Sequence, residues 1–326
     1  MGRKCNEDAR GIEYMSHVEV VVPCYNEQEC VRPLYEEMNR VFIGIQDTEF
    51  SILFINDGSS DGTLSEIKEL VEEFGSEKIR YLSLSRNFGK EAAIYAGFEN
   101  CKGDIIVLMD ADLQHPPALI PEMLQGLAEG YDVCGARRVS RKGEPMFRSF
   151  FSKAFYGVIN RLTAMKLVPG GSDFRAMKKC VADAVVSFPE RERFIKGIFS
   201  WAGFETKWIE YENVPRHAGK SKWSFFGLVR YAWKGYFSFA TAPLRVAVFI
   251  GVATVVGAFI YAIRVLIQVH ILHSRLWEDT TTIILLLLFL GGVLASLLGV
   301  VGEYLAKIYA EIKQRPIYVE KESNLS

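Results

Sequence analysis

Short apolar runs alternate with longer helical patterns in the first half of this 326-residue chain, and this alternation restricts the fold more than any other feature. Five short apolar runs predict strands, at Val18–Val22, Ser51–Ile55, Tyr81–Leu84, Ile105–Met109 and Asp132–Gly135. Apolar residues at helical spacing predict helices between them, at Glu27–Ile45, Thr63–Phe74, Glu91–Asn100 and Ala118–Glu129. We therefore expect an α/β fold with a mostly parallel sheet that is covered on both faces.

A polar cluster follows each of the first four predicted strands. Ligands bind at the carboxyl ends of the strands in such sheets, so the four clusters should converge on one rim. The clusters are Pro23-Cys24-Tyr25-Asn26-Glu27, Asn56-Asp57-Gly58-Ser59, Arg86-Asn87-Phe88-Gly89-Lys90 and Asp110-Ala111-Asp112.

The last of these clusters places two carboxylates one residue apart, directly after a buried strand. Asp110 and Asp112 would point the same way if the strand continued through them. The pair offers hard oxygen ligands suited to Mg²⁺ or Mn²⁺ on a diphosphate. A solvated turn that caps a helix is the competing interpretation, because an Asp-x-Asp pair occurs by chance in many chains.

Charge and motif spacing argue against several classes of protein. The net charge of −1 gives no overall field for nucleic acid. No Gly-x-Gly-x-x-Gly follows the first predicted strand, and Val214 stands where a P-loop ending in Gly219-Lys220-Ser221 needs a glycine. The cysteines lack the Cys-x-x-Cys spacing of zinc sites. A dehydrogenase, a P-loop ATPase and a nucleic-acid-binding protein are therefore not expected.

The C-terminal third is apolar enough to predict a membrane hairpin. The hydrophobic content of the chain is 49%, which is high for a soluble protein. Val246–Ile263 has no charge and reaches spanning length when it continues past Arg264 to Leu272, and Thr280–Gly302 is a second charge-free run. A buried helical hairpin in a soluble protein is the alternative.

Basic residues flank the two apolar runs and predict that both chain ends are cytoplasmic. They are Arg230, Lys234, Arg245, Lys307, Lys313 and Arg315. Residues 1–15 lack the apolar core of a signal peptide and are expected to form a loose tail. We therefore predict a multi-pass protein of the cell membrane, with its α/β domain on the cytoplasmic side.

Two segments mix aromatic with basic residues, Glu144–Lys166 and Phe225–Phe239. This composition suits helices that lie at a membrane surface, and an ordinary amphipathic helix on the sheet is the alternative for the first segment. Between them, Gly170 to Arg175 predicts a Gly-rich turn that presents an acid and a base. Arg216 to Trp223 predicts a flexible basic loop.

Taken together, these motifs resemble the family 2 glycosyltransferases of the polyprenyl-phosphate type, namely dolichol-phosphate mannose synthases and, more closely, bacterial bactoprenol glucosyltransferases. The resemblance covers about residues 16–318 and implies a GT-A, Rossmann-like nucleotide-binding domain followed by two transmembrane helices. The Gln-x-x-Arg-Trp signature of processive polysaccharide synthases is absent. The domains implied are a tail 1–15, a GT-A catalytic domain 16–222, an amphipathic juxtamembrane segment 223–243, a transmembrane hairpin 244–306 and a cytoplasmic tail 307–326.

The resemblance also assigns site residues by position in the motifs. Nucleotide-sugar binding is assigned to Pro23, Tyr25, Glu27, Asp57, Lys90, Asp110, Ala111, Asp112, Gln114, Arg216 and Lys222. A divalent cation, Mg²⁺ or Mn²⁺, is assigned to Asp110, Asp112 and Gln114. Lipid-phosphate binding is assigned to Arg137, Arg148 and Arg175, with Arg138 and Arg141 as alternatives to Arg148. For Asp57 the alternative is a helix cap.

Asp173 and Asp112 are the catalytic residues that the resemblance implies. The expected reaction is inverting transfer of a sugar, glucose first of all, from a UDP-sugar to undecaprenyl phosphate at the cytoplasmic membrane face. Asp173 is the expected acid or base, although an Asp beside Arg175 could equally orient that guanidinium.

Other readings of function stay open. Nothing in the sequence fixes the sugar pocket, so mannose from GDP-mannose, an N-acetylhexosamine and an aminoarabinose derivative remain alternatives. A membrane adaptor without catalysis is a different class, against which the intact acidic and basic motif residues count. Small residues in the second apolar run permit close helix packing within one chain or in a homo-oligomer; they are Gly291, Gly292, Ala295, Ser296 and Gly299.

Overall fold

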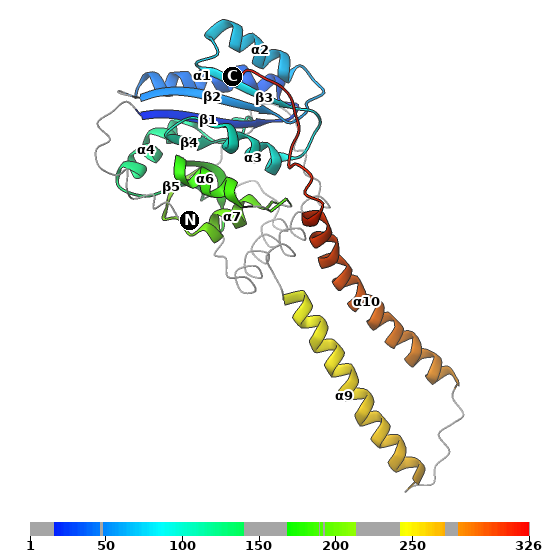
Figure 1. Ribbon diagram of the computed structural model, residues 1–326. Coiled ribbons are helices and arrows are strands. Elements are labelled where there is room, and N and C mark those ends of the chain that lie inside the picture. Colours follow the sequence, from blue (N-terminus) through cyan, green and yellow to red (C-terminus); the bar gives the residue numbers. More distant parts are fainter. Residues whose placement is uncertain are drawn as a thin grey trace. The chain divides into compact units, whose positions relative to one another are not determined.

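The computed structural model describes residues 16–45, 48–139, 168–188, 190–191, 193–212, 242–270 and 280–325. The chain forms two compact units, one made of Met1–Ala232 with Arg315–Ser326 and the other of Trp233–Gln314. The first unit holds an eight-stranded sheet, and the second holds two long helices (Figure 1).

The sheet has the strand order β7-β5-β6-β4-β1-β2-β3-β8. Strand pairs β1/β2, β1/β4, β2/β3 and β5/β7 are parallel, whereas β6 is antiparallel to β4 and β5. The predicted α/β fold with a mostly parallel, Rossmann-like sheet is therefore confirmed. The strands are β1 (Ser16–Cys24), β2 (Thr48–Asn56), β3 (Ile79–Leu84), β4 (Ile105–Leu108), β5 (Val133–Arg138), β6 (Gly171–Lys178), β7 (Thr206–Tyr211) and β8 (Glu320–Ser323).

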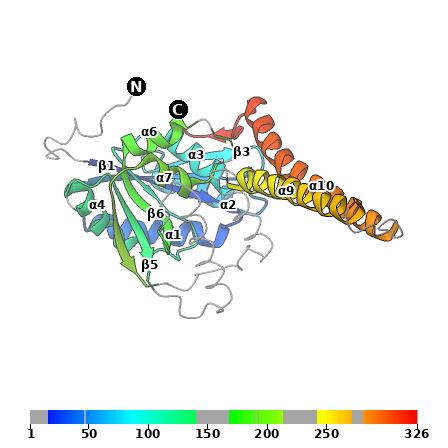
Figure 2. The ribbon, with the colours of Figure 1, turned by 90° about the horizontal axis from the view of Figure 1, so that it is seen from below.

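Helices cover both faces of this sheet, as Figure 2 shows for α1 and α2 on one face and for α3, α6 and α7 on the other. Val20 and Val22 point to the face of α1, while Val21 points to the face of α3. Gly97 lets α3 approach closely, because a Cβ there would lie 2.3 Å from Val21 Cγ1. The helices are α1 (Gln28–Ile43), α2 (Thr63–Phe74), α3 (Lys90–Asn100), α4 (Ile120–Ala128), α6 (Lys179–Ser187) and α7 (Ile195–Ala202).

The strand register brings the carboxyl ends of four parallel strands to one edge. Cys24 pairs with Asn56, Asn56 pairs with Ser83, and Val21 pairs with Leu108. The Asn56 side chain also donates to Ser83 Oγ at 2.9 Å. The loops that follow β1, β2, β3 and β4 therefore leave the sheet side by side, which is the rim expected from the sequence.

The Gly-rich turn predicted over Gly170–Arg175 is wrong for most of its length. Gly170 has the left-handed backbone of a turn, with φ of 82°, but β6 begins at Gly171. Phe174 is fully buried in the core, and Asp173 and Arg175 alternate with it on the opposite face. A strand results because the residues alternate with a period of two, a pattern that the glycines obscured.

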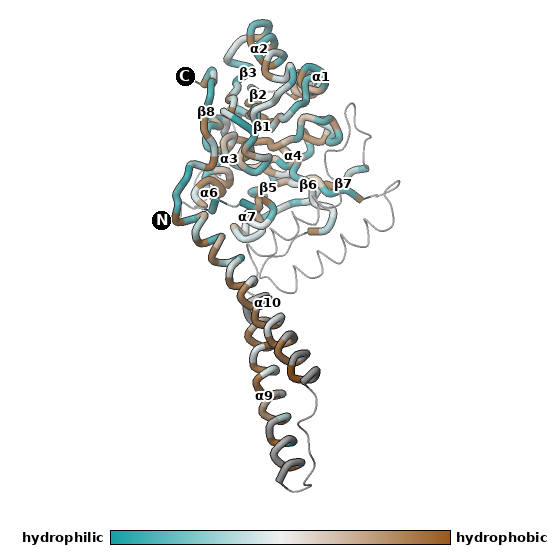
Figure 3. The backbone as a smooth tube through the Cα atoms, turned by 90° about the vertical axis from the view of Figure 1, so that its right-hand side faces the viewer, coloured by the Kyte–Doolittle hydropathy of each residue, from teal (hydrophilic) through white to brown (hydrophobic). Residues whose placement is uncertain are grey.

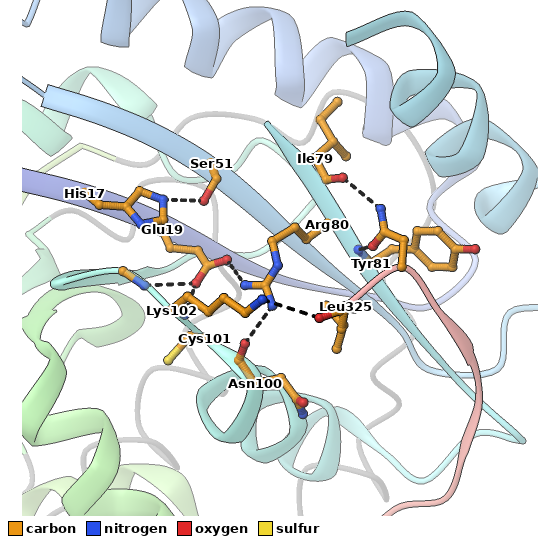
Figure 4. Close-up of polar contacts among 12 residues, drawn as sticks. His17, Glu19, Ser51, Ile79, Arg80, Tyr81, Asn100, Cys101, Lys102 and Leu325 are labelled. Atoms are coloured by element: carbon orange, nitrogen blue, oxygen red, sulfur yellow. Dashed lines mark hydrogen bonds and ion pairs between the residues drawn. The ribbon is translucent and has the colours of Figure 1, made fainter. Parts of the chain in front are cut away.

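The chain returns to the first unit after the second long helix. Strand β8 pairs antiparallel with β3. Asn324 accepts from Tyr81 N at 2.6 Å and donates to Ile79 O at 3.1 Å, and Lys102 donates to Leu325 O at 3.4 Å (Figure 4). No sequence pattern predicts this strand, because Glu320–Ser323 is polar and lies at a sheet edge.

A buried ion pair fixes the amino ends of the strands, at the edge opposite the rim (Figure 4). Glu19 is fully buried and lies 2.6 Å from Arg80, which in turn donates to Asn100 O. The other carboxylate oxygen of Glu19 accepts from Lys102 N and Gly103 N. A charged pair in this position is tolerated because both partners are hydrogen-bonded.

The second unit consists of α9 (Ala242–His270) and α10 (Thr280–Ile312), whose apolar residues Figure 3 shows along both helices. Among the described residues, one stretch is long and apolar enough to cross a membrane, Phe289–Ile312, and Val246–Tyr261 is a shorter apolar helix. Of the two predicted spans, the described residues therefore support one by length and composition. The predicted membrane-surface segments Glu144–Lys166 and Phe225–Phe239 lie outside the described residues.

Candidate active site

Hydrogen bonds join the loops after β1 and β2 at the rim. Asn26 has a left-handed backbone, with φ of 53°, and its side chain accepts from Ser60 N at 2.8 Å. Asn26 N donates to Ser59 Oγ at 3.0 Å, and Glu27 N donates to Thr63 Oγ1 at 2.9 Å. Pro23 lies near the end of β1, and the ring of Tyr25 is 38% exposed just beyond it. These bonds give the predicted nucleotide residues a rigid support.

Asp57 supports the loop that precedes α3. It is buried, and its two carboxylate oxygens accept from Phe88 N at 2.7 Å and from Gly89 N at 2.9 Å. Burial raises the pKa of Asp57, and these two hydrogen bonds oppose the rise. Gly58 has φ of 62°, and a Cβ there would lie 2.3 Å from the Arg86 carbonyl carbon. Asp57 thus bonds the two residues that precede α3, and its role toward a nucleotide base stays a prediction.

Lys90, the first residue of α3, joins two of the predicted site carboxylates. Its Nζ lies 2.7 Å from Asp110 Oδ1 and 2.7 Å from Asp173 Oδ2. Asp110 lies on the turn after β4, and Asp173 comes from β6. Burial opposes the charge of Lys90, but the two carboxylates outweigh it and raise the pKa of the ammonium. One nitrogen thus holds the predicted metal-binding and catalytic carboxylates in a single site.

A tight turn places Asp112 and Gln114 together. Strand β4 ends at Leu108, so Asp110 and Asp112 stand on a turn and not on a continuing strand. Gln114 N donates to Asp112 Oδ1 at 3.1 Å, and Leu113 between them has φ of 57°. An Asx turn with a left-handed leucine is strained, and such strain is concentrated at functional sites.

The two Asp residues and Gln114 form a donor set that suits a hard divalent cation. No group of three or more His, Cys, Asp and Glu side chains that could hold a metal occurs in the described part of the chain. The cation site at Asp110, Asp112 and Gln114 stays a prediction. Asp110 already binds one positively charged group, the ammonium of Lys90.

Asp173 is surrounded by cations. Its side chain is 15% exposed, with Lys90 on Oδ2 and Lys196 Nζ at 3.7 Å from Oδ1. Burial by itself would raise the pKa of Asp173, but Lys90 and Lys196 outweigh burial and hold the pKa well below its usual range. The carboxylate is therefore ionised near neutral pH.

Arg175 and Arg137 make different contacts from each other. Arg175 is buried, donates to Ser172 O at 3.0 Å, and places its guanidinium 4.1 Å from the centre of the Phe199 ring. Burial lowers the pKa of Arg175. Arg137 is more exposed, donates to Pro169 O at 3.3 Å, and lies 3.8 Å from Glu210. The roles of both arginines toward a lipid phosphate stay predictions.

Comparison with known proteins identifies the family of this site. A family model described as glycosyl transferase family 2 matches residues 19–184. The chain belongs to glycosyl transferase family 2. A second model, described as GtrB C-terminal hairpin, matches residues 242–308. The family resemblance expected from the motifs is confirmed, and the protein is a glycosyltransferase.

Relatives of this family member match it over nearly their whole length. It is 41% identical over 308 residues to the putative glycosyltransferase CsbB of Bacillus subtilis (strain 168), a match that covers 94% of this chain and 92% of the relative. It is 36% identical over 307 residues to the SfII prophage-derived bactoprenol glucosyl transferase of Shigella flexneri, with 94% and 98% covered.

Solved structures of other glycosyltransferases share less with this family member. The mannosyltransferase PcManGT from Pyrobaculum calidifontis, in complex with GDP-Man and Mn²⁺, has a TM-score of 0.46 and 18% identity, covering 64% of this chain and 59% of that one. Glucosyl-3-phosphoglycerate synthase from Mycobacterium tuberculosis, in complex with Mn²⁺, UDP-glucose and phosphoglyceric acid, has a TM-score of 0.46 and 15% identity, covering 67% and 76%.

Several predicted site residues of this glycosyltransferase lie outside the described residues, namely Arg148, Arg216 and Lys222, together with Arg141. Ala111 is buried between the two Asp residues of the turn, and Arg138 ends β5. The structure thus brings Lys90, Asp110 and Asp173 into direct contact and places Asp112 and Gln114 on the adjoining turn.

Sequence reasoning missed Lys196, the second cation on Asp173. It belongs to the first turn of α7, in Arg193-Phe194-Ile195-Lys196-Gly197. One signal could have drawn attention to it: a lysine in the first turn of a helix faces the positive end of the helix dipole, which is unfavourable without a compensating anion. Lys90 at the start of α3 carries the same signal.

Proposed function

We propose that this glycosyltransferase transfers glucose from UDP-glucose to a polyprenyl phosphate, with inversion, at the cytoplasmic face of the membrane. The bactoprenol glucosyl transferase of Shigella flexneri, 36% identical over 94% of this chain, supports the acceptor and the sugar. The observation that carries the proposal in the structure is the bridge of Lys90 between Asp110 and Asp173. Lys90 joins the Asp110 turn, whose carboxylates would bind the metal of the donor diphosphate, to Asp173, which lies between Lys90 and Lys196.

Asp110, Asp112 and Gln114 would hold the divalent cation on the donor diphosphate. Bound there, the cation stabilises the negative charge of the departing nucleoside diphosphate. Pro23, Tyr25, Glu27 and Asp57 stand on the same rim and would hold the base and ribose. Their loops are fixed by the Asn26–Ser60 and Asp57–Gly89 hydrogen bonds, so the nucleotide meets a site that needs little rearrangement.

The acceptor brings its own nucleophile. A phosphate monoester has a second pKa of about 6, so near neutral pH it is largely a dianion and needs no strong base. Its approach to an anionic donor requires cations, which the arginines and lysines around the rim supply. An oxygen of the lipid phosphate would attack the anomeric carbon from the face opposite the leaving diphosphate.

Asp173 would position this reaction and not deprotonate the acceptor. A carboxylate whose pKa is held far below its usual value is a weak base, and at neutral pH it has no proton to give. Asp173 joins Lys90 and Lys196 by ion pairs, and the Arg175 side chain donates to its backbone carbonyl at 3.3 Å. It can therefore hold these cations at the distances that the two phosphates require.

The membrane placement is supported by the second unit and by the chain path. Large apolar side chains of α9 and α10 are exposed, such as Phe249 at 79% and Leu298 at 70%, and lipid would cover them. Strands β7 and β8 flank the hairpin in sequence and belong to one sheet, which supports a chain that leaves and re-enters on the same side of the membrane. With Lys313 and Arg315 after α10, that side would be cytoplasmic.

The donor is tested by transfer of radiolabelled sugars to undecaprenyl phosphate in membranes that carry the protein. The panel comprises UDP-glucose, GDP-mannose, a UDP-N-acetylhexosamine and a UDP-aminoarabinose derivative. We expect a chloroform-soluble product from UDP-glucose alone. A product from another donor would overturn the sugar assignment and keep the reaction. No product from any donor would overturn the reaction itself.

A further inference from the structure

Lys196 contacts Asp173 from a different direction than Lys90 does. Its Nζ donates to Gly171 O at 3.1 Å and lies 3.7 Å from Asp173 Oδ1. Oδ1 is buried and accepts no hydrogen bond among the described residues, whereas Oδ2 has Lys90 at 2.7 Å. Each carboxylate oxygen of Asp173 thus faces its own ammonium group.

The two lysines stand at the starts of two helices that are tied together. Lys90 begins α3, and Lys196 is the second residue of α7. The side chain of Glu91 in α3 accepts from the backbone N–H of Ile195, the first residue of α7, at 2.9 Å. This hydrogen bond opposes a shift of α7 relative to α3, and such a shift would move Lys196 relative to Lys90.

Lys90 and Lys196 differ in what else they bind. Lys90 is shared between Asp173 and Asp110, so a divalent cation that binds Asp110 would repel the Lys90 ammonium and weaken its hold. The one carboxylate with which Lys196 forms an ion pair, among the described residues, is that of Asp173. Donor binding at the Asp110 turn therefore leaves the Lys196 contact as the more constant of the two.

We infer that Lys196 is a positioning residue for Asp173, which it holds in place at Oδ1 while the metal diphosphate occupies the Asp110 turn. The inference rests on the proposed function, in which Asp173 orders the cations around the two phosphates. Lys196 acts through Asp173 and needs no contact with the sugar. Its loss should therefore slow the transfer step and leave donor binding unchanged.

A double-mutant cycle between Lys196 and Asp173 tests this inference. Transfer is measured for wild type, Lys196→Met, Asp173→Asn and the double variant, with Lys196→Arg as the conservative change. Lys207→Met is the matched control, because Lys207 forms an ion pair with Glu129 that lies outside the site residues. kcat, KM for the donor and the Kd of the manganese–donor complex are determined for each protein.

We expect Lys196→Met to lower kcat by about 10- to 100-fold, the size of effect that a small misplacement of a reacting group produces. Donor KM and Kd should stay within about twofold of wild type. Lys196→Arg should recover most of kcat, and Lys207→Met should match wild type. In the Asp173→Asn background, Lys196→Met should have no further effect.

Two results would overturn the inference. One is full kcat in Lys196→Met, and the other is an equal loss of kcat in the presence and absence of the Asp173 carboxylate. Failure of the proposed function looks different, because wild type would then transfer none of the sugars. In that case the same cycle is read from thermal unfolding, where zero coupling between positions 173 and 196 contradicts the ion pair on which the inference depends.

Discussion

Lys90 Nζ lies 2.7 Å from Asp173 Oδ2, a contact that joins the start of α3 to strand β6 across 83 residues of sequence. The same nitrogen forms an ion pair with Asp110 on the turn after β4. Three elements of the sheet edge are thereby held at one point. This point is the centre of the proposed active site.

Replacement of Lys90 by Met should leave two carboxylates facing each other without their shared cation. We expect kcat for sugar transfer to fall by about 10²- to 10³-fold, as for the loss of one preorganised electrostatic group. The measurement is steady-state transfer to the lipid acceptor. Lys207→Met, which removes an ion pair on Glu129, is the control and should retain wild-type activity. Wild-type turnover in Lys90→Met would contradict this role.

Replacement of Asp112 by Asn should abolish metal-dependent binding of the donor and leave the fold intact. Asp112 keeps a hydrogen-bond acceptor for Gln114 N in this variant, so the turn survives while a charged ligand is lost. Titration calorimetry with UDP-glucose and Mn²⁺ measures the effect, and thermal unfolding checks the fold. Unchanged donor affinity at an unchanged melting temperature would remove Asp112 from the metal site.

The acid limb of the pH–rate profile should report the acceptor and not Asp173. Because Lys90 and Lys196 hold the pKa of Asp173 far below its usual value, this carboxylate stays ionised as pH falls from 8 to 5. The lipid phosphate takes up a proton near pH 6, at about its second pKa. We therefore expect kcat/KM to fall below about pH 6 in wild type and at the same pH in Asp173→Asn. A limb that moves in the variant would assign it to Asp173.

Replacement of Glu19 by Gln should destabilise the catalytic unit without touching the rim. Arg80 would keep its burial and lose its counter-charge, a change that costs about 3–5 kcal/mol in comparable buried pairs. Chemical unfolding followed by tryptophan fluorescence measures the loss. Glu49→Gln, at a more exposed position in β2, serves as the control and should lie within about 0.5 kcal/mol of wild type. Equal stability of both variants would contradict the account.

Asn324, directly after β8, should hold this C-terminal strand on the sheet. Its side chain makes two hydrogen bonds to the backbone of β3, so Asn324→Ala should cost about 1–3 kcal/mol. Lys321→Ala changes an exposed residue of the same strand and should be neutral. Thermal unfolding of the two variants makes the comparison. Identical melting temperatures would mean that β8 contributes nothing to the stability of the sheet edge.

The parallel half of the sheet could be predicted because its residues carry periodic patterns. Thr63–Phe74 was predicted with the bounds that α2 has, and β1 to β5 lie within a few residues of the predicted strands. The rim followed from the rule that parallel strands end at one edge. Local periodicity was sufficient for these elements.

The elements that were missed depend on long-range contacts. Strand β8 is held by β3, which lies more than 200 residues earlier, and its own sequence carries no apolar alternation. Lys196 reaches Asp173 only because α7 packs near β6 in the folded chain, and no local sequence pattern predicts this contact. The sequence of β6 suggests a turn because the strand begins with Gly171, directly after Gly170, although Phe174 and Ala176 alternate with Asp173 and Arg175.

In the proposed mechanism, the Asp110 turn directs sugar transfer to a lipid phosphate. The most direct measurement is the chloroform-extractable label formed from radiolabelled UDP-glucose and undecaprenyl phosphate, with wild type and Asp112→Asn compared in the presence of Mn²⁺ and of EDTA. We predict labelled lipid from wild type with Mn²⁺, and none with EDTA or with the variant. Equal labelled lipid from Asp112→Asn, or labelling that persists in EDTA, would contradict the claim.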